Sequence, residues 1–503
     1  MISKKRWYLY LFMYLLMFSC FFIIPSTSVP ASSDVIENNN SGIPDKGLYK
    51  NILKTLGKKS NETFTKQEAA KIASLSTSER IKNIKGIKYL KNLKELELEG
   101  HGLKNLKGIQ SLTKLEKLSI SDNAIKSLKP LKNLKNLKEL DAGYNHIKNT
   151  KGLEKLKKLK KLNLERNRLN SIEELKNLTN LKHVNLYFNN LKSLKGLGKQ
   201  KKLTWLDASW NELSGIKELK KLTKLKYLNL SRNQITSLQG LEKQKKLKKL
   251  YLDRNNLTGM QEVENLIQLQ ELYAEENCLK SLKGIEKLKN LTWLNVSSNQ
   301  LETLNYIQNL NRLEYINASV NQLVTVDELL TVNNLNSINL SFNRITELPD
   351  LRSLPKLDFI SFGYNFLTEE AEQLRAKLPK VYFTSYETLF EDSLKHQNLD
   401  YSISFKEPAD VNMITSSTTR ISGCIHMPAE KIQIMIEENL SDEDEFETYY
   451  LADVDKDGNF VFENLDFKKF ASGKCDMRIT IGCEYDSKYK YYTGPSLHTY
   501  QLK

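Results

Sequence analysis

Residues 203–213 read LTWLDASWNEL, and the same arrangement of apolar residues returns 22 residues before and 22 residues after this stretch. The asparagine at its ninth place is the clearest marker of the period. It recurs every 22 residues without an insertion, at Asn123, Asn145, Asn167, Asn189, Asn211, Asn233, Asn255, Asn277, Asn299, Asn321, Asn343 and Asn365. His101 holds the same place one period earlier, which gives thirteen units.

Leucine occupies the first place of every unit, from Leu93 to Leu357. Further apolar residues stand at places four, six and eleven. The unit therefore reads L-x-x-L-x-L-x-x-N-x-L, which resembles the leucine-rich repeat. The alternative for a leucine periodicity is an amphipathic helix or a coiled coil. A period of 22 residues with a fixed asparagine does not fit a heptad, which disfavours that alternative.

The spacing of the apolar residues predicts the backbone of each unit. Places four and six put two apolar side chains on one side of a short strand, which cannot bury them alone. Stacked units bury one continuous core, and their strands add in parallel along the inner face of a curved solenoid. We expect the asparagine side chains to bond the turn backbone in a ladder. The expected fold is an α/β solenoid, a leucine-rich-repeat horseshoe with a parallel β-sheet on the concave face and 3₁₀ helices or turns on the convex face.

Both ends of the array carry helical signals that predict caps over the open core. Residues 43–92 are expected to form an N-terminal helical cap and a half-repeat. A helix around residues 48–56 follows Ile43-Pro44-Asp45, and the capping box Thr65-Lys66-Gln67-Glu68 opens a short helix through Ala73. Residues 93–380 hold the thirteen units and a C-terminal cap, with a predicted helix over residues 369–378.

The N-terminus predicts a secretion signal over residues 1–31, followed by a linker over residues 32–42. Basic residues at positions 4–6 precede an apolar run from Trp7 to Ile24, and Val29 and Ala31 suit a cleavage after Ala31. The alternative is an uncleaved membrane anchor, because the apolar run is long for a signal.

The segment over residues 381–503 is expected to be a linker and an all-β domain. Strand-like stretches stand at residues 420–425, 431–436, 447–452, 459–462 and 477–483, and Asp457-Gly458-Asn459 predicts a hairpin between two of them. The size and pattern resemble bacterial Ig-like surface modules. A disulfide between Cys424 and Cys475 or Cys483 is left open.

The opening Ile43-Pro44-Asp45, the helical cap and the 22-residue units together resemble the internalin family of bacterial surface proteins, from about residue 43 to residue 380. The resemblance implies a secreted or surface-bound protein that binds a host or cell-envelope protein through its concave face. The chain departs from the family in its tail, which has no L-P-x-T-G sorting signal and no Gly-Trp modules. This departure favours a released form over covalent attachment to the wall.

Places three, five, seven and eight of each unit are expected to build the concave surface. Of these 52 residues, thirteen are aromatic, a share of 25% against 9% for the whole chain. The 5 Å spacing of strands predicts contact between aromatic residues in neighbouring units. Some rings could instead fill gaps beside the strand, above all Phe188 and Phe342 at place eight. The predicted partner-binding residues are Tyr187, Trp205, Trp210, Tyr227, Tyr251, Tyr273, Trp293 and Tyr315.

Net charge is +16 for the chain, but the 52 concave places hold twelve acidic and six basic residues. The positive charge therefore lies on the convex ridge and edges. Such lysines are usually a solvated face, and the alternative function is binding of an anionic polymer (wall polymer, lipid or nucleic acid) through this ridge. No nucleic acid is expected as a partner, because the basic residues do not interleave with the aromatic ones.

Nothing in the sequence predicts catalysis, a cofactor or a metal site. The six histidines have no metal-ligand spacing, and His183 is expected to belong to the aromatic surface. The prediction is a monomeric, non-enzymatic binding protein with a role in adhesion or virulence. It is expected to be secreted and extracellular, with retention at the cell surface or an N-terminal membrane anchor as alternatives.

Overall fold

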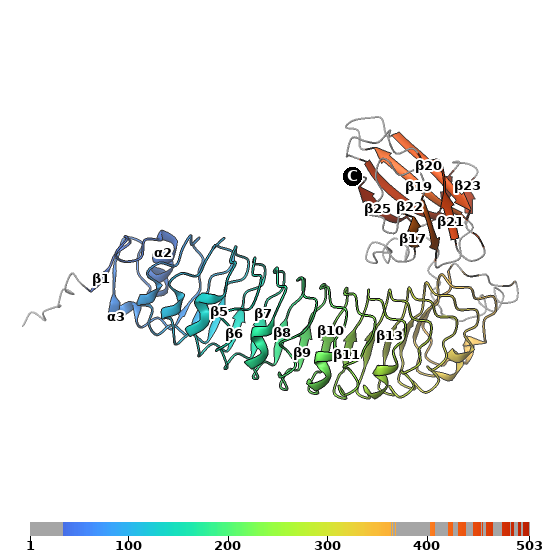
Figure 1. Cartoon of the computed structure of the whole chain (residues 1–503), viewed down its shortest axis with the longest axis horizontal. Helices are drawn as coiled ribbons and strands as arrows, with labels where there is room; N and C mark the ends of the chain where they lie inside the picture. Colours follow the sequence, from blue (N-terminus) through green and yellow to red (C-terminus); the bar gives the residue numbers. More distant parts are fainter. Residues whose placement is uncertain are drawn as a thin grey trace, which may run out of the picture.

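The computed structural model describes residues 34–363, 365 and 368, and, near the C-terminus, residues 403–407, 421–425, 431–438, 446–453, 455, 459–465, 475–482, 484–486, 491–493 and 496–501. The repeats stack side by side in a curved row that begins at the N-terminal cap (Figure 1). The expected signal over residues 1–31 and the expected helix over residues 369–378 lie outside the described residues.

One parallel sheet of fourteen strands runs the length of the array, with neighbours in sequence order. Thirteen strands come from the thirteen units, so the predicted horseshoe is confirmed. Each of these strands has three residues, at places three to five of its unit. They are β4 (Glu95–Glu97), β5 (Lys117–Ser119), β6 (Glu139–Asp141), β7 (Lys161–Asn163), β8 (His183–Asn185), β9 (Trp205–Asp207), β10 (Tyr227–Asn229), β11 (Lys249–Tyr251), β12 (Glu271–Tyr273), β13 (Trp293–Asn295), β14 (Tyr315–Asn317), β15 (Ser337–Asn339) and β16 (Phe359–Ser361).

The fourteenth strand, β3 (Ser74–Leu75), pairs with β4 and belongs to the cap. β3 gives the half-repeat a strand that the sequence did not predict. The helix opened by the capping box is shorter than predicted. That helix, α3 (Lys66–Ala69), ends before Ala73, and its predicted capping box is present. The other predicted helix is α2 (Lys46–Thr55), whose N-cap Asp45 accepts a hydrogen bond from the Leu48 N–H at 2.9 Å. A two-stranded antiparallel ribbon of β1 (Val35–Ile36) and β2 (Phe64–Thr65) completes the cap.

The repeated asparagine joins each unit to the one before it. The Asn211 side chain accepts a hydrogen bond from the Leu191 N–H at 3.0 Å and donates to the Leu186 carbonyl at 3.0 Å. It also donates to the carbonyls of Ala208 and Ser209 at 3.2 and 3.1 Å. The same pattern recurs from Asn123 to Asn365, which confirms the expected ladder. His101 accepts from the Ile81 N–H and so replaces part of an asparagine.

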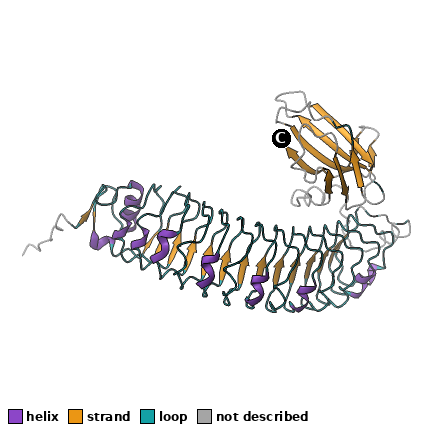
Figure 2. Cartoon of the chain, viewed as in Figure 1, coloured by secondary structure: helices purple, strands orange, loops and turns teal. Residues whose placement is uncertain are grey.

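The convex face alternates between two kinds of unit (Figure 2). In one kind a 3₁₀ helix of five residues covers the core, and in the next kind a glycine with positive φ makes a tight turn, as at Gly152 and Gly196. The alternation runs from η3 to Gly284. It breaks in the next unit, where Tyr306, with a φ of 83°, stands at the place of the glycine although a 3₁₀ helix would be due, and η7 follows one unit later. The 3₁₀ helices are η1 (Ile87–Tyr89), η2 (Ile109–Ser111), η3 (Lys129–Asn133), η4 (Glu173–Asn177), η5 (Lys217–Lys221), η6 (Gln261–Asn265), η7 (Asp327–Thr331) and η8 (Leu351–Ser353).

Nine further strands lie in the C-terminal part. β17 (Ile403–Glu407), β18 (Ile421–Ile425) and β21 (Asn459–Phe462) form one antiparallel sheet. A second contains β20 (Phe446–Asp453), β19 (Lys431–Glu438), β22 (Cys475–Gly482) and β25 (Ser496–Gln501). β23 (Glu484–Asp486) pairs with β24 (Tyr491–Thr493). The five predicted strands are present.

The predicted hairpin at Asp457-Gly458-Asn459 is wrong, because the two strands that flank it belong to different sheets. β20 pairs with β19, whereas β21 pairs with β18. The connection is closed instead by the Asp455 N–H, which donates to the Asn459 carbonyl at 2.9 Å. The side chains of Cys424, Cys475 and Cys483 lie outside the described residues.

Candidate binding surface

The short strands turn two side chains per unit toward the concave face. In β9, for example, Leu206 at place four is fully buried, while Trp205 and Asp207 on either side of it are partly exposed. Each parallel partner is in register, so that Trp205 stands beside His183 on one side and Tyr227 on the other. Side chains at one place therefore form rows across the units.

An unbroken row of rings crosses seven consecutive units of this face. We call it the aromatic ladder; its members are His183, Trp205, Tyr227, Tyr251, Tyr273, Trp293 and Tyr315. The three predicted pairs are stacked, with ring centroids 4.9 Å apart for Trp205 and Tyr227, 4.6 Å for Tyr251 and Tyr273, and 3.6 Å for Trp293 and Tyr315. His183 extends the ladder by stacking on Trp205 at 3.8 Å.

Two diagonal contacts make the ladder continuous. Tyr227 at place three meets Tyr251 at place five at 5.4 Å, and Tyr273 at place five meets Trp293 at place three at 6.1 Å. Stacked and tilted aromatic pairs each contribute about 0.5–1.5 kcal/mol beyond the area they bury. The ladder is thus a rigid strip whose rings are held by one another before any partner binds.

The N-terminal units carry charges where the ladder carries rings. Place three reads Glu95, Lys117, Glu139 and Lys161, and the ion pairs Lys117–Glu95 and Lys161–Glu139 each measure 3.1 Å. These four side chains neutralise one another in an exposed setting, where such pairs contribute little free energy. At places three and five, aromatic side chains therefore begin only with the units of His183 and Trp205.

A second group of aromatic side chains lies on the turns that follow the strands. We call it the edge ridge, which consists of the place-eight residues Tyr144, Arg166, Phe188, Trp210 and Arg232. The Phe188 and Trp210 rings lie 5.5 Å apart, and Tyr187 contacts both. Arg166 lies over the rings of Tyr144, Tyr187 and Phe188, and Arg232 lies over Trp210. The expectation that basic and aromatic residues do not interleave is wrong here.

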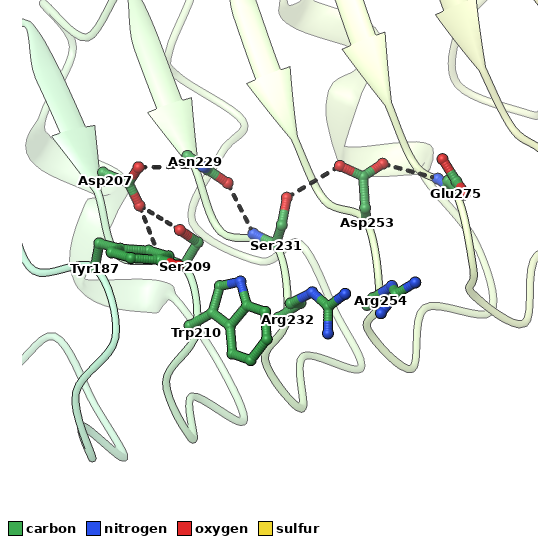
Figure 3. Close-up of a pocket in the computed structure, with 10 residues that line it drawn as sticks. All are labelled: Tyr187, Asp207, Ser209, Trp210, Asn229, Ser231, Arg232, Asp253, Arg254 and Glu275. Carbon is green, nitrogen blue, oxygen red and sulfur yellow. Dashed lines mark hydrogen bonds between the residues drawn. The ribbon is translucent and has the colours of Figure 1, made fainter. Parts of the chain in front are cut away.

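A polar pocket of about 330 Å³ lies beside Trp210 and Arg232 of the edge ridge (Figure 3). Its lining residues are Tyr187, Asp207, Ser209, Trp210, Asn229, Ser231, Arg232, Asp253, Arg254 and Glu275. Hydrogen bonds tie the floor together across four units. Asp207 accepts from Asn229, the Ser231 N–H donates to Asn229, and the Ser231 hydroxyl donates to Asp253. Asp253 also accepts from the Glu275 N–H at 3.1 Å.

The carboxylates of this pocket are costly to ionise. Burial raises the pKa of Asp253 to about 7, and the nearby Glu275 charge adds to the effect. Burial likewise raises the pKa values of Asp207 and Glu275. Glu276, buried beside Arg254 with an N–O distance of 2.7 Å, has a pKa raised to about 8 by burial, despite that ion pair.

We expect Asp253→Asn to stabilise the protein more at pH 8 than at pH 5. The pKa of Asp253 is raised in the folded state above the value of about 3.9 in unfolded chains, so folding favours its protonated form. Stability is therefore lost as pH rises from about 4 to about 7, and the full penalty persists above that range. Each pKa unit corresponds to about 1.4 kcal/mol, and asparagine removes the titration.

Urea unfolding of both proteins at the two pH values measures this difference. Asp122→Asn is the matched control, because Asp122 is an exposed carboxylate of the same surface. An equal gain for Asp253→Asn at pH 5 and pH 8 would show that its ionisation does not oppose folding.

The eight predicted site residues fall into two groups. Six of them belong to the aromatic ladder, and Tyr187 and Trp210 belong with the edge ridge. Of the two suspected gap-fillers, Phe342 is 8% exposed and does pack inside, whereas Phe188 is 43% exposed. The arginines Arg166 and Arg232 were missed. Both arginines stand at place eight, directly before the repeated asparagine, in the same row as Tyr144, Phe188 and Trp210. That shared position is the sequence signal that could have identified them.

Neither a cluster of metal-ligand side chains nor a membrane-spanning helix occurs in the described part of the chain. No group of three or more His, Cys, Asp or Glu side chains there could hold a metal ion. No helix among those residues has the length and apolar content needed to cross a membrane.

Comparison with known proteins agrees with this architecture. A family model described as Leucine Rich repeats (2 copies) matches residues 113–155 and 201–243. The fold is a leucine-rich-repeat horseshoe. No curated protein is similar enough in sequence to match the chain.

Solved structures of leucine-rich-repeat proteins resemble this horseshoe. An internalin from Listeria monocytogenes shares 29% identity and a TM-score of 0.61 over 66% of this chain and 98% of its own. A leucine-rich-repeat protein from Leptospira interrogans shares 27% identity and a TM-score of 0.51, over 64% of this chain and 97% of its own. A TDR receptor shares 26% identity and a TM-score of 0.50, over 60% and 61%. The structural neighbours thus include internalin-like bacterial proteins, and the fold is a scaffold for protein interaction.

Proposed function

We propose that this chain is a secreted or surface-associated, internalin-like module that binds a host or cell-envelope protein against its aromatic ladder. The ladder is the observation that carries the proposal. It places six tyrosine and tryptophan rings and one histidine ring on seven consecutive units of the concave face. Tyrosine and tryptophan dominate the binding energy of protein interfaces, most of all when they are clustered and rigid.

The core does not require these rings. The leucine core beneath is complete without them, since the place-four residues under the ladder, such as Leu206, Leu228 and Leu294, are fully buried. Conversely, the ladder rings are only partly buried, and a partner would remove their exposed edges from water. Burial of apolar area contributes about 25 cal/mol per Å². The fold and the ladder therefore serve separable purposes, stability and binding.

The proposal includes the domain organisation that the sequence predicts. Residues 1–31 act as the secretion signal, 32–42 as a linker, 43–92 as the cap, 93–380 as the repeats with their C-terminal cap, and 381–503 as a linker with an Ig-like domain. The separate sheets formed by β17-β18-β21 and β20-β19-β22-β25 support the last assignment. The module acts as an extracellular monomer in adhesion or virulence, without a catalytic site or cofactor.

The test is the combined replacement of Trp205, Tyr227 and Trp293 by alanine. We expect at least about a 100-fold loss of partner affinity, because single hot-spot rings are each worth about 2 kcal/mol. Residues 32–503 serve as bait for surface extracts of host cells and bacteria. The captured protein is identified by mass spectrometry, and its affinity for each variant is then measured directly.

Glu95, Lys117 and Glu139 provide the matched control, because they occupy the same place three on other units of the same sheet. Their combined replacement by alanine should leave affinity within a few-fold of wild type. Partner binding that survives the loss of the three rings, with far-UV circular dichroism unchanged, would refute the proposal.

The alternative function, binding of an anionic polymer through convex lysines, is weakened by one set of contacts. Several of these lysines donate to an asparagine one unit earlier, as Lys114 does to Asn92 at 2.6 Å and Lys202 to Asn180 at 2.7 Å. Others form ion pairs, such as Lys195 with Glu173 at 3.0 Å. These side chains link neighbouring units, so the regular spacing of the lysines is explained by their contribution to the repeat structure.

A further inference from the structure

We propose that the edge ridge is a separate docking surface for an acidic polysaccharide, a chain of sugar rings that carry carboxylate or sulfate groups. Its two arginines would hold the anionic groups, and its three rings would stack against the faces of the sugars. This ligand and this surface are distinct from the protein partner and the aromatic ladder of the proposed function.

The rings of the edge ridge are open to solvent in a way that the ladder rings are not. Tyr144 is 48% exposed, Phe188 43% and Trp210 39%, and no other aromatic side chain within residues 34–363 is as exposed. In the ladder, ring faces are covered by other rings at 3.6 to 4.9 Å. The edge ridge therefore offers exposed aromatic rings on three of its five units, along an open edge.

The Arg166 side chain lies against several of these rings. Its guanidinium carbon lies 5.4 Å from the Tyr144 ring centre, 5.5 Å from that of Tyr187 and 5.1 Å from that of Phe188. The side chain is exposed, and it has no ion pair with any described residue. A guanidinium stacked on rings keeps its in-plane N–H donors for a planar or tetrahedral oxyanion, and the stacking reduces the entropy lost on binding.

At the other end of the ridge, Arg232 is half-buried, lies over one ring and also lines the polar pocket with Asp253 and Glu275. Its guanidinium carbon lies 4.0 Å from the ring centre of Trp210. In Figure 3 the two side chains lie next to each other on neighbouring turns, beyond the ends of the strands. The five ridge residues thus run ring, arginine, ring, ring, arginine along five consecutive units, a regular linear order that suits a polymer.

The backbone at place eight does not explain these residues. φ is 51° at Tyr144, 46° at Arg166, 54° at Phe188 and Trp210, and 55° at Arg232, all in the left-handed region. Glycine or asparagine would suit this conformation better, and other residues lose roughly 1–2 kcal/mol in it. Large aromatic and basic side chains are kept at a conformational cost, which is typical of a surface with a function.

Charge selects an acidic occupant. No ridge position holds a carboxylate, and the ridge units carry the exposed Lys148, Arg168 and Lys192 within four residues of place eight. Sugar rings present C–H faces that pack on aromatic rings, and carboxylate or sulfate groups match the arginine fork. An acidic polysaccharide combines both features at every ring.

The decisive variant removes rings without changing charge. Phe188→Gly combined with Trp210→Gly suits the positive φ of both positions, so the fold is retained. With a heparin octasaccharide as probe, we expect at least a 10-fold loss of affinity and an unchanged dependence of log Kd on log salt. Arg166→Lys, which keeps the charge and loses the stacked fork, should also lose about 10-fold.

Two further measurements test whether the polysaccharide binds the edge ridge and not the aromatic ladder, and whether the edge ridge prefers a polysaccharide to other polyanions. The ladder variant with Trp205, Tyr227 and Trp293 replaced by alanine should bind the octasaccharide as wild type does, whatever its effect on protein binding. Poly-L-glutamate and oligothymidylate of equal charge should bind more weakly and be indifferent to the loss of Phe188 and Trp210. The inference is overturned if the glycine variant binds heparin with full affinity, or if either of those polymers loses affinity to the same extent.

Discussion

Asn211→Ala is expected to lower the free energy of unfolding by about 3 kcal/mol or more, since each buried backbone group left without a partner costs about 1–3 kcal/mol. The Asn211 side chain serves the Leu191 N–H and three carbonyls, two in its own unit and one in the unit before. Alanine can serve none of them. Water cannot replace the amide readily, because Asn211 is only 8% exposed.

Urea unfolding followed by circular dichroism measures this loss, and hydrogen exchange should show faster opening at Leu191 and Leu213. Asn190→Ala is the control one unit earlier, because Asn190 is exposed and makes a single side-chain contact, to Glu212 at 3.4 Å. It should change stability by less than about 0.5 kcal/mol. If Asn211→Ala lowers the free energy of unfolding no more than Asn190→Ala does, the row of asparagine side chains does not stabilise the stacked repeats.

The horseshoe followed from the sequence because its period is strict. A leucine at every place one and an asparagine at place nine of twelve of the thirteen units leave only one way to bury the apolar side chains. β3 was missed for a corresponding reason. Ile72 and Leu75 match places one and four only at an offset of 21 residues, so the strict period of 22 passes over them, although Leu75 pairs in register with Leu96 of β4.

The C-terminal strands show a different limit. Apolar alternation located all five predicted strands, but the turn signal at residues 457–459 indicated only that the chain bends there. Pairing is decided by contacts distant in sequence, and β21 pairs with β18, whose partner residues lie about forty positions earlier. A local turn motif carries no information on that choice.

The candidate surface was predictable in part. Pairs at one place, such as Trp205 and Tyr227, follow from the parallel register and the strand spacing. The diagonal contact between Tyr227 and Tyr251 depends on how two side chains lean, which the sequence does not specify. The edge ridge was missed because the left-handed conformation of place eight is usually signalled by glycine or asparagine, and here the residues are tyrosine, arginine, phenylalanine and tryptophan.

A second large loss of stability is expected at the glycines that alternate with the 3₁₀ helices of the convex face. Gly196→Ala is expected to destabilise the repeats by about 3 kcal/mol or more, from left-handed strain and overpacking together. The φ of Gly196 is +119°, and a Cβ there would lie 2.2 Å from the Ile172 carbonyl oxygen and 2.9 Å from its carbon. That carbonyl cannot move freely, because it accepts the hydrogen bond from the Leu175 N–H that begins η4.

Gly198→Ala, two residues further on, is the matched control, because it is the same substitution in the same unit. A Cβ at Gly198 meets only the Glu218 carbonyl oxygen, at 3.6 Å, which is an ordinary contact, and its φ is not in the left-handed region. Alanine there should be neutral or slightly stabilising, because it restricts the unfolded chain. Thermal unfolding of both variants beside wild type tests the pair. If the two variants have equal melting temperatures, the close approach of neighbouring units at Gly196 is not what requires glycine, and the two-unit period of the convex face needs another cause.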